Sequence, residues 1–423
     1  MTIVLTLAAM FALLLMRVPV AFALGGLGLA MLLLGGFSPL MAPQAVLSTL
    51  DGFILLAVPL FLLMSNILLR AGVGNDLFAA VSAWVGHWPG GLAVATILSC
   101  GVFAAISGSS VATAATIGTV AIPEMINRGY NKRFVYGLLA AGGTLGILIP
   151  PSIPMIIYGF VTEESVIALF LAGIGPGIAL LLFFIIFSMI YARMGGQELE
   201  PKKDWAERKR ATFRALPSVV LAVLIISGIY SGAFTPTEAA AIGFAAALII
   251  TGPIMRVLTW DALKKAVFDS MATTVAIILI IAGAKVFGKA ITLYRIPQDI
   301  SVMITQGVDT ELGFILIVTA VLLVMGLVFE ALSMVLIMTP VLLPAALALG
   351  FDPIWFGVYM VIMVECALIT PPVGLNLYVI QSVAKARLGE VARGVAPFLI
   401  LMFVCAAVLY LWHDLALYIP FKL

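Results

Sequence analysis

Charged side chains are scarce in this sequence. Only 10% of its 423 residues are Asp, Glu, Lys or Arg, whereas a soluble domain carries roughly 25%. Hydrophobic residues make up 63% of the chain. Because no soluble core buries that much apolar surface, the chain is predicted to lie in a lipid bilayer. A formal net charge of +2 gives no basis for nucleic-acid binding.

Metal-binding and nucleophilic motifs are missing as well. The three cysteines, Cys100, Cys366 and Cys405, lie far apart within apolar runs, so we interpret them as small buried residues. The two histidines, His87 and His413, lie at the ends of apolar runs, and no CxxC, HExxH or GxSxG pattern occurs. These absences argue against a transition-metal site and against an intramembrane enzyme.

A nucleotide-binding loop is also excluded. Gly283–Lys289 matches GxxxxGK, but the next residue is Ala290, where a phosphate loop has Ser or Thr. The segment lies in an apolar helical run with no preceding strand, so the match fails its structural context. No ATP site is therefore predicted.

Long apolar runs dominate the chain instead. Uninterrupted runs such as Val166–Tyr191 predict helices rather than the short alternating strands of a barrel. Segment 2–16 has no basic residues before it, so we interpret it as a transmembrane helix of the mature protein and not as a signal peptide. The ten predicted spans are 2–16, 18–36, 51–71, 134–162, 165–192, 214–234, 236–256, 268–290, 354–383 and 391–415.

Two further apolar stretches, 90–122 and 312–349, do not fit one span each. Small or polar residues interrupt both of them, Ser107–Ser110 in the first and Glu330–Ser333 in the second. We predict that each stretch is a re-entrant hairpin of two short helices. Its non-helical tip must be buried in protein or line a cavity.

The two halves of the chain share one order of elements. Pro150-Pro151 recurs as Pro371-Pro372, and Pro19–Gly25 has a counterpart in Pro236–Gly243. Five crossings per half is an odd number, so the second half is predicted to be inverted relative to the first, as in many secondary transporters. The predicted organisation is an all-α polytopic membrane protein with a first repeat at 1–192 (hairpin 90–122, broken helix 134–162), a charged linker at 193–213, and a second repeat at 214–423 (hairpin 312–349, broken helix 354–383).

Basic residues set the predicted orientation. They concentrate in the linker, which the positive-inside rule places in the cytoplasm. Counting spans outward from the linker places most other basic loops in the cytoplasm and both termini in the periplasm. Lys289 and Arg295 are exceptions on the outer side. The first hairpin then opens to the cytoplasm and the second to the periplasm.

The helix breaks are candidate cation sites. Proline removes a backbone donor and frees carbonyls one turn earlier, and inside a membrane these carbonyls need partners. Together with hydroxyl groups they form oxygen cages that suit hard cations. We expect each hairpin tip to meet the Pro-Pro break of its own half. The predicted cation-binding residues are Ser107, Gly108, Ser109, Ser110, Gly143, Gly146, Pro150, Glu330, Ser333, Thr370, Pro371 and Gly374.

Polar and ionisable residues at membrane depth are candidates for substrate binding. Lys285 also has a structural interpretation, in which it reaches toward the outer membrane surface. Glu365 near the second break is a further functional candidate. Glu238 at a helix start fits a carboxylate that stabilises the first helical turn. The predicted substrate-binding residues are Ser109, Ser152, Asn376 and Lys285.

Four segments resemble the large membrane subunit of TRAP transporters, the tripartite ATP-independent periplasmic family. They are Phe103–Gly118 (FAAISGSSVATAATIG), Gly143–Ser152 (GTLGILIPPS), Ser231–Gly243 (SGAFTPTEAAAIG) and Thr370–Tyr378 (TPPVGLNLY). The segment Asp51–Gly72 is similar too. The resemblance covers essentially the whole chain, and its specificity lies in the combination of motifs.

The resemblance implies a sodium-driven secondary transporter of the bacterial inner membrane that uses no cofactor. A periplasmic binding protein would deliver an organic acid, such as a C4-dicarboxylate or a sialic acid, and a small four-helix membrane subunit would brace the chain. The hairpins and broken helices would form a transport domain that moves as an elevator within a scaffold. The family's sodium sites lie at hairpin tips and broken helices, which match the cation-binding residues named above.

Two alternatives stay open. A stand-alone sodium/dicarboxylate carrier of related architecture would need no partner subunit. A channel would need a continuous polar pore lining, and the repeat-related hairpins argue against one.

Overall fold

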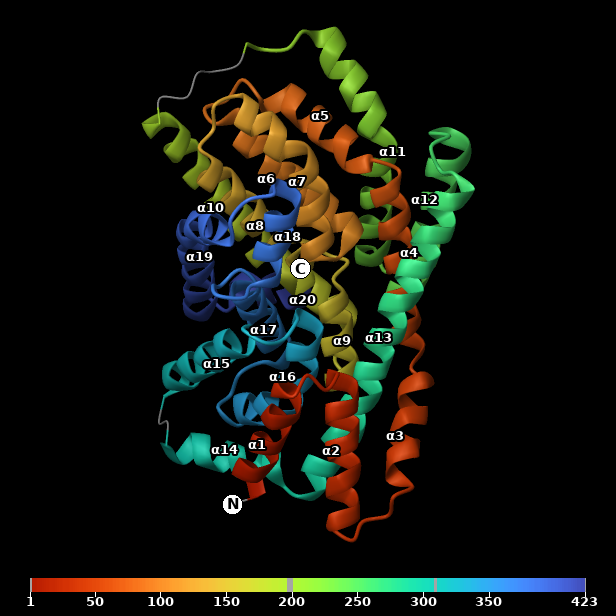
Figure 1. Cartoon of the computed structure of the whole chain (residues 1–423), viewed down its shortest axis with the longest axis vertical. Coiled ribbons are helices and arrows are strands. Elements are labelled where there is room, and N and C mark those ends of the chain that lie inside the picture. The colour runs from red at the N-terminus through yellow and green to blue at the C-terminus, as the bar shows by residue number, and fades with distance from the viewer. Residues whose placement is uncertain (1, 196–200, 308–309, 423) are drawn as a thin grey trace.

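Helices make up the described structure. A computed structural model describes residues 2–195, 201–307 and 310–422, and no strand occurs within these ranges (Figure 1). The predicted all-α fold is therefore confirmed. Residues 1 and 423, and residues 196–200 of the predicted linker, lie outside the described ranges.

Twenty α-helices and two short irregular helices follow one another along the described chain. The first half contains α1 (Thr2–Leu15), α2 (Val20–Leu34), α3 (Met41–Leu50), η1 (Phe53–Leu56), α4 (Ala57–Arg70), α5 (Val73–Val85), α6 (Gly91–Ser107), α7 (Ser110–Asn127), α8 (Lys132–Leu148), α9 (Ile153–Thr162) and α10 (Val166–Met194). The second half contains α11 (Trp205–Tyr230), α12 (Pro236–Ile249), η2 (Ile250–Ile254), α13 (Trp260–Leu293), α14 (Ile296–Gly307), α15 (Glu311–Met325), α16 (Ala331–Ala348), α17 (Pro353–Leu368), α18 (Leu375–Ala384), α19 (Leu388–Leu411) and α20 (Asp414–Lys422).

Seven described helices are long and apolar enough to cross a membrane, or eight if α8 and α9, which meet at 41°, form one bent span. Seven of the ten predicted spans recur among these eight. The predicted spans at 2–16, 18–36 and 354–383 do not, because α1, α2, α17 and α18 have only 14, 15, 16 and 10 residues, and a membrane-spanning helix needs about 20. The eighth is α16, which the sequence placed in a hairpin.

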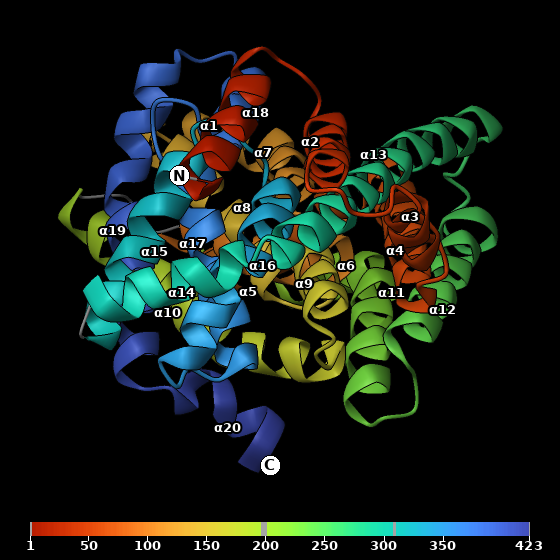
Figure 2. The same cartoon turned by 90° about the horizontal axis from the view of Figure 1, so that it is seen from below.

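Most of the helices sort into two groups. The outer group consists of α2, α3, α4, α11, α12 and α13, which lie along one side of the molecule in both views (Figures 1 and 2). In this group α13 packs against α2, α3 and α4, and α12 packs against α4 and α11. The inner group consists of α6–α10 and α16–α19, with α8 packed against α6, α7 and α19. α5 contacts both groups through α11 and α6.

Polar residues start many of these helices. Thr235 and Glu238 form a capping box at the start of α12, in which each side chain accepts a hydrogen bond from the other residue's backbone amide, and Pro236 occupies the first helical turn. The interpretation of Glu238 as a helix-stabilising residue is therefore confirmed. Asp352 caps α17 in a similar way, with a carboxylate oxygen that accepts from the amides of Ile354 and Trp355.

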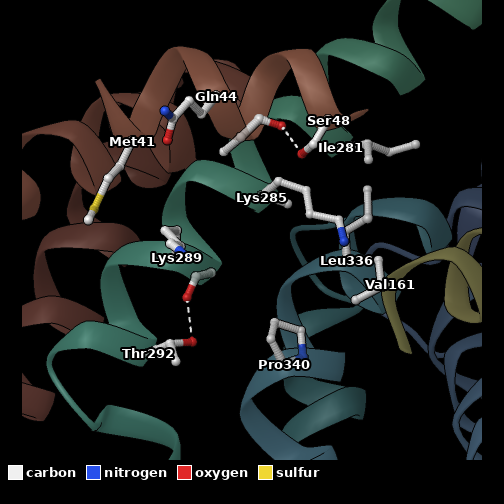
Figure 3. A pocket seen from close by; sticks show the side chains of 13 residues that line it. Met41, Gln44, Ser48, Val161, Ile281, Lys285, Lys289, Thr292, Leu336 and Pro340 are labelled. Carbon is white, nitrogen blue, oxygen red and sulfur yellow. Dashed lines mark hydrogen bonds between the residues drawn. The ribbon is translucent and has the colours of Figure 1, made fainter. Parts of the chain in front are cut away.

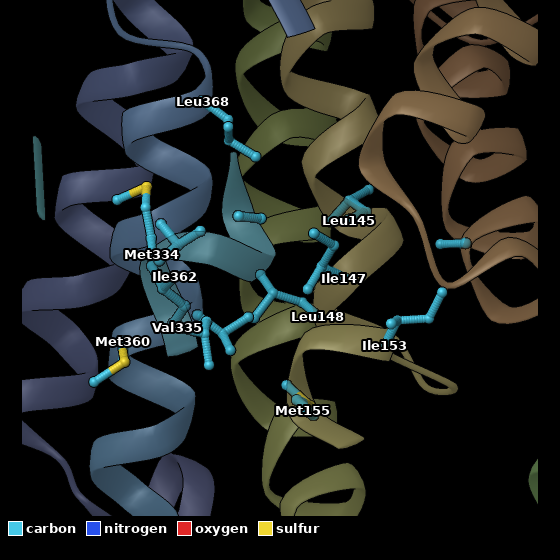
Figure 4. Packing of buried hydrophobic residues seen from close by; sticks show 14 of the residues in the cluster. Leu145, Ile147, Leu148, Ile153, Met155, Met334, Val335, Met360, Ile362 and Leu368 are labelled. Carbon is cyan, nitrogen blue, oxygen red and sulfur yellow. The ribbon is translucent and has the colours of Figure 1, made fainter. Parts of the chain in front are cut away.

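The core of the inner group surrounds the places where its helices break. Figure 4 shows Leu148 of α8 directed toward Val335 of α16, with Met334 and Ile362 behind it. All four side chains are buried. Lipid chains are as apolar as leucine, so this core is held by close packing and not by exclusion of water.

Glycines let two inner helices touch through their backbones. A Cβ atom on Gly394 of α19 would collide with the carbonyl oxygen of Arg133, and one on Gly137 of α8 would collide with the carbonyl oxygen of Gly394. Small residues at such crossings allow the close approach that stabilises helix pairs in membranes.

We expect Gly394→Ala to destabilise the protein by about 1–3 kcal/mol, because the added methyl group overpacks the crossing of α8 and α19. The matched control is Gly389→Ala in the same helix, where a Cβ atom would meet nothing within 4 Å. Thermal unfolding in detergent should show a lower midpoint for the first variant only. Equal midpoints for both variants would show that the crossing of α8 and α19 accommodates the added methyl group, which would contradict the prediction.

Candidate functional site

The first hairpin turns at a short Ser-Gly-Ser tip. α6 ends at Ser107, Gly108 adopts the left-handed conformation with φ of +61°, and Ser109 caps α7. The Ser109 hydroxyl accepts from the amide of Ala112 at 3.4 Å. Glycine takes this conformation without the steric penalty of a side chain, so the break falls within the segment that the sequence indicated.

Three oxygen atoms gather beneath this tip. The hydroxyls of Ser107 and Thr113 lie 2.9 Å apart, and the Thr113 hydroxyl donates to the carbonyl oxygen of Ser109 at 2.9 Å. Ser107 and Thr113 are fully buried. Thr113 was absent from the sequence prediction. Its spacing of four residues from Ser109, one helical turn, was the signal that could have revealed it.

The first tip lies against the first Pro-Pro break. A Cβ atom on Gly146 would lie 2.6 Å from the carbonyl oxygen of Ser109. One on Gly143 would lie 2.9 Å from the carbonyl oxygen of Ser110. One on Gly108 would collide with the carbonyl oxygen of Pro151. The structure thus brings together the tip and break residues of the first predicted cation site.

Ser152, just after this break, is fully buried and caps α9. Its hydroxyl accepts from the amide of Met155 at 3.4 Å. Ser109 and Ser152 therefore hold the N-termini of two helices that start at helix breaks. Such N-termini carry partial positive charge and exposed amide donors, which suit an anionic group.

The second tip and the second break share a cavity of about 450 Å³. Glu330 and Ser333 line it from the tip, and Val373 and Leu375 line it from the break. Helix α13 and the start of α2 form the opposite wall. Gly374 has a φ of +47°, which fits the sharp turn before α18.

The Thr370 hydroxyl donates to the carbonyl oxygen of Cys366 at 2.6 Å. Pro371 is exposed at the surface of the break, whereas the first break is buried at Pro150. The structure therefore assembles the second predicted cation site more loosely than the first.

Several buried polar side chains have no hydrogen-bond partner among the described residues, and three of them lie on the second hairpin and the second broken helix. They are Ser333, Glu365 and Asn376, and each is at most 1% exposed. An unpaired polar group costs free energy in the membrane interior. Buried oxygen atoms with spare acceptor capacity suit a hard cation such as sodium, so these residues fit the ion that the sequence implied.

Glu365 links the two halves of the chain. Its carboxylate lies beside the Ser110 hydroxyl at the start of α7, without a well-formed hydrogen bond between them. Helix α18, which carries Asn376, also packs against α7. The second broken helix thus meets the first hairpin. Sequence analysis named Glu365 as a candidate but could not place it beside the first tip.

Lys285 lies apart from the other predicted substrate residues. It lines a cavity of about 520 Å³ between α3 and α13 on one side and α9 and α16 on the other, which we call the lysine cavity (Figure 3). Neither Ser109, Ser152 nor Asn376 lines it. Val161, which does, follows Ser152 by nine residues on α9, or about 13 Å of helix.

The Lys285 ammonium group points into the protein. Its nitrogen lies 4.7 Å from the centre of the Phe160 ring, a distance at which a cation is attracted to the aromatic face. Figure 3 shows the side chain extending from α13 toward Leu336 and Val161. This direction differs from that of a lysine that reaches along its own helix to the membrane surface.

Residues 7–415 match the family described as the tripartite ATP-independent periplasmic transporter, DctM component. The chain belongs to this family. The resemblance seen in the sequence motifs is therefore confirmed. As a member of the TRAP large permeases, the chain is a multi-pass membrane component of a transporter.

Several TRAP permeases are similar over most of their length. The C4-dicarboxylate TRAP transporter large permease protein DctM of Pseudomonas aeruginosa is 40% identical over 356 residues, covering 84% of this chain and 83% of the relative. The sialic acid permease protein SiaM of Vibrio cholerae is 34% identical over 403 residues, covering 95% and 94%. The ectoine permease protein TeaC of Halomonas elongata is 34% identical over 365 residues, covering 86% of each.

A solved structure shares the fold. The YdaH transporter of Alcanivorax borkumensis superposes with a TM-score of 0.51 at 13% sequence identity, covering 89% of this chain and 88% of that one. At such low identity the likeness concerns the arrangement of helices alone.

We expect Thr113→Val to destabilise the protein by about 1–3 kcal/mol, because the substitution leaves buried oxygen atoms of the first tip unpaired. Thr119→Val is the matched control on α7, since the Thr119 side chain is exposed and bonds only the carbonyl of Ala115. Thermal unfolding of both variants, together with Ser107→Ala and the Ser107→Ala/Thr113→Val double variant, measures the coupling of the two hydroxyls. Additive effects of the two substitutions would contradict the contact between them.

Proposed function

We propose that this chain is the large membrane subunit of a sodium-coupled importer of organic acids in the bacterial inner membrane. A periplasmic binding protein delivers the substrate, and a small four-helix membrane subunit braces the outer helix group. The observation that carries this proposal is the contact between the first hairpin tip and the first Pro-Pro break, in a chain that belongs to the TRAP permease family.

The substrate class follows from the relatives. Two of those described above are named for a C4-dicarboxylate and for sialic acid, and both ligands carry carboxylate groups. The proposed substrate of this chain is therefore a small organic acid. Helix N-termini at the breaks are suitable for its carboxylate, because Ser109 and Ser152 cap α7 and α9, and Asn376 lies in the first turn of α18.

The first sodium site is formed by the first tip and the first break. The hydroxyl of Ser107 and the carbonyl of Ser109 supply oxygen, and Ser110 contributes from the start of α7. Gly108, Gly143, Gly146 and Pro150 let the two backbones approach closely enough for carbonyl groups to take part. Such neutral oxygen donors match the preferences of a hard cation.

The second sodium site uses the second tip and break. Glu330 and Ser333 line the shared cavity, and Thr370, Pro371 and Gly374 form the break that faces them. Thr113 extends the first set beyond the residues that the sequence indicated, and Glu365, already a candidate from the sequence, adds a carboxylate beside Ser110. When bound, sodium supplies positive charge that offsets these oxygen dipoles and the Glu330 carboxylate.

The proposed transport cycle uses both helix groups. The two halves of the chain form two inverted repeats, and their hairpins and broken helices, α6–α9 and α15–α18, move as an elevator against the outer group. Sodium and substrate drive this movement only through different affinities for the outward and inward arrangements. The proposed orientation places the linker in the cytoplasm and both termini in the periplasm, as the distribution of basic residues indicates.

The decisive experiment is uptake into proteoliposomes under an imposed sodium gradient, with a panel of labelled carboxylates. The chain is reconstituted alone and with its small partner, in each case with and without the binding protein, and a potassium gradient serves as control. We expect uptake that requires sodium, the binding protein and the small partner together. Sodium-driven uptake by this chain alone would instead establish a stand-alone carrier, and uptake under the potassium gradient would overturn sodium coupling.

We expect Ser109→Leu and Asn376→Leu to reduce sodium-dependent uptake to background, because a bulky apolar side chain fills the space at a helix N-terminus and removes its polar group. Thr119→Leu on α7 and Tyr378→Leu on α18 are matched controls at exposed positions of the same helices. Gel filtration of all four variants establishes that they fold. Normal sodium-dependent uptake by both Ser109→Leu and Asn376→Leu would refute the assignment of these residues to the binding site.

A further inference from the structure

The lysine cavity carries two cationic side chains and no acidic one. Lys285 and Lys289 both line it, and no Asp or Glu is among the described residues of its wall. The two lysines are four residues apart on α13, so their side chains emerge from the same helix face about 5–6 Å apart. Neither takes part in an ion pair within the described part of the chain.

Two acidic side chains lie close to the cavity without lining it. Glu163 and Glu164 border a neighbouring cavity of about 420 Å³, which Lys285 also lines. Glu163 is exposed and Glu164 is half-buried, so their attraction acts mainly on Lys285, and solvent screens the part that comes from Glu163. Lys289 is exposed too and has no acidic residue on the wall beside it. The wall of the lysine cavity itself therefore carries positive charge only.

The size of the cavity suits a small ligand. Its volume of about 520 Å³ falls within the roughly 300–1,000 Å³ that is typical of small-molecule sites. Gln44 of α3 adds an amide, whereas the hydroxyls of Ser48 and Thr292 donate to carbonyls of their own helices. The lysines are thus the main recognition groups of the cavity, and an anion is the ligand that they favour.

We propose that the lysine cavity is a receiving site that concentrates small organic anions before they reach the helix breaks. Two ammonium groups on one helix face favour an anion with two oxyanion groups over an anion with one. The site is separate from the first break, because Val161 and Ser152 lie about 13 Å apart along α9, and it adjoins the second tip, because Leu336 follows Ser333 by one turn of α16. The inference rests on the proposed function for the identity of the transported anion.

Cysteine labelling tests the charge of the cavity without any transport measurement. The native cysteines Cys100, Cys366 and Cys405 are fully buried, so an introduced cysteine is the one reactive thiol. Gln44→Cys places it in the cavity, and Leu47→Cys places it on α3 outside the cavity wall. Both variants are labelled as full-length chains in lipid nanodiscs with two methanethiosulfonate reagents, one with an anionic sulfonatoethyl group and one with a cationic trimethylammonium-ethyl group.

The measured quantity is the labelling rate of the anionic reagent divided by that of the cationic reagent. At low ionic strength we expect this ratio to be about tenfold higher for Gln44→Cys than for Leu47→Cys. In 1 M salt, where the screening length is about 3 Å, the two variants should give nearly the same ratio. The added substitutions Lys285→Met and Lys289→Met should abolish the difference at low ionic strength, and Lys285→Arg with Lys289→Arg should preserve it. At matched ionic strength, succinate should slow the anionic reagent more than acetate does.

Equal reagent preferences at the two cysteines would overturn the proposal, as would a preference that survives both methionine substitutions. Equal protection by succinate and acetate would overturn the preference for two oxyanion groups. The proposed function is judged separately, since sodium-dependent uptake is measured on the unmodified chain. A charged cavity in a chain without sodium coupling, or sodium coupling without a charged cavity, would each refute one proposal and leave the other standing.

Discussion

Broken helices within a bilayer impose one requirement on this protein, which is that each backbone group released at a break needs a partner inside the protein. The first half meets this requirement through contact between its tip and its break. Gly143 and Gly146 let the carbonyls of Ser109 and Ser110 approach α8, and Thr113 donates to the Ser109 carbonyl. In the proposed sodium site the same atoms are the oxygen donors, so the pairing of backbone groups and the proposed ion binding depend on one set of atoms.

The meeting of the two halves follows from this packing. Glu365 of the second broken helix lies beside Ser110 of the first tip, and α18 packs against α7. A change at one break therefore alters the surroundings of the other, and this contact is the physical basis on which the proposed ion and substrate sites are coupled. The core around Leu148 and Val335 joins the same elements through apolar contacts (Figure 4), so the inner helices form one packed unit.

Lysine side chains and helix N-termini both supply positive potential, but they lie in different parts of the structure, and electrostatics gives the reason. A full charge deep in a bilayer is costly, and the breaks use helix N-termini, whose partial charges need no counter-ion. Lys285 and Lys289 lie near the end of α13 and line the lysine cavity. In the proposed pathway an anion first meets the ammonium groups of Lys285 and Lys289 and then the helix N-termini at the breaks. Because the helix N-termini carry only partial charges, the anion binds there without being held too tightly to leave.

Local sequence determined the helical class, the positions of the breaks and the family, because proline, glycine and capping side chains act on the backbone within one turn. The Ser107–Ser110 tip and the Thr235–Glu238 capping box are of this kind. The number of long spans was overestimated, since apolar composition alone does not fix where α1, α2 and α17 end. Tertiary structure alone decided that Thr113 joins the first tip, that Glu365 meets Ser110, and that Lys285 belongs to a separate cavity. These relations depend on how helices far apart in sequence pack against each other, and no local pattern encodes that packing.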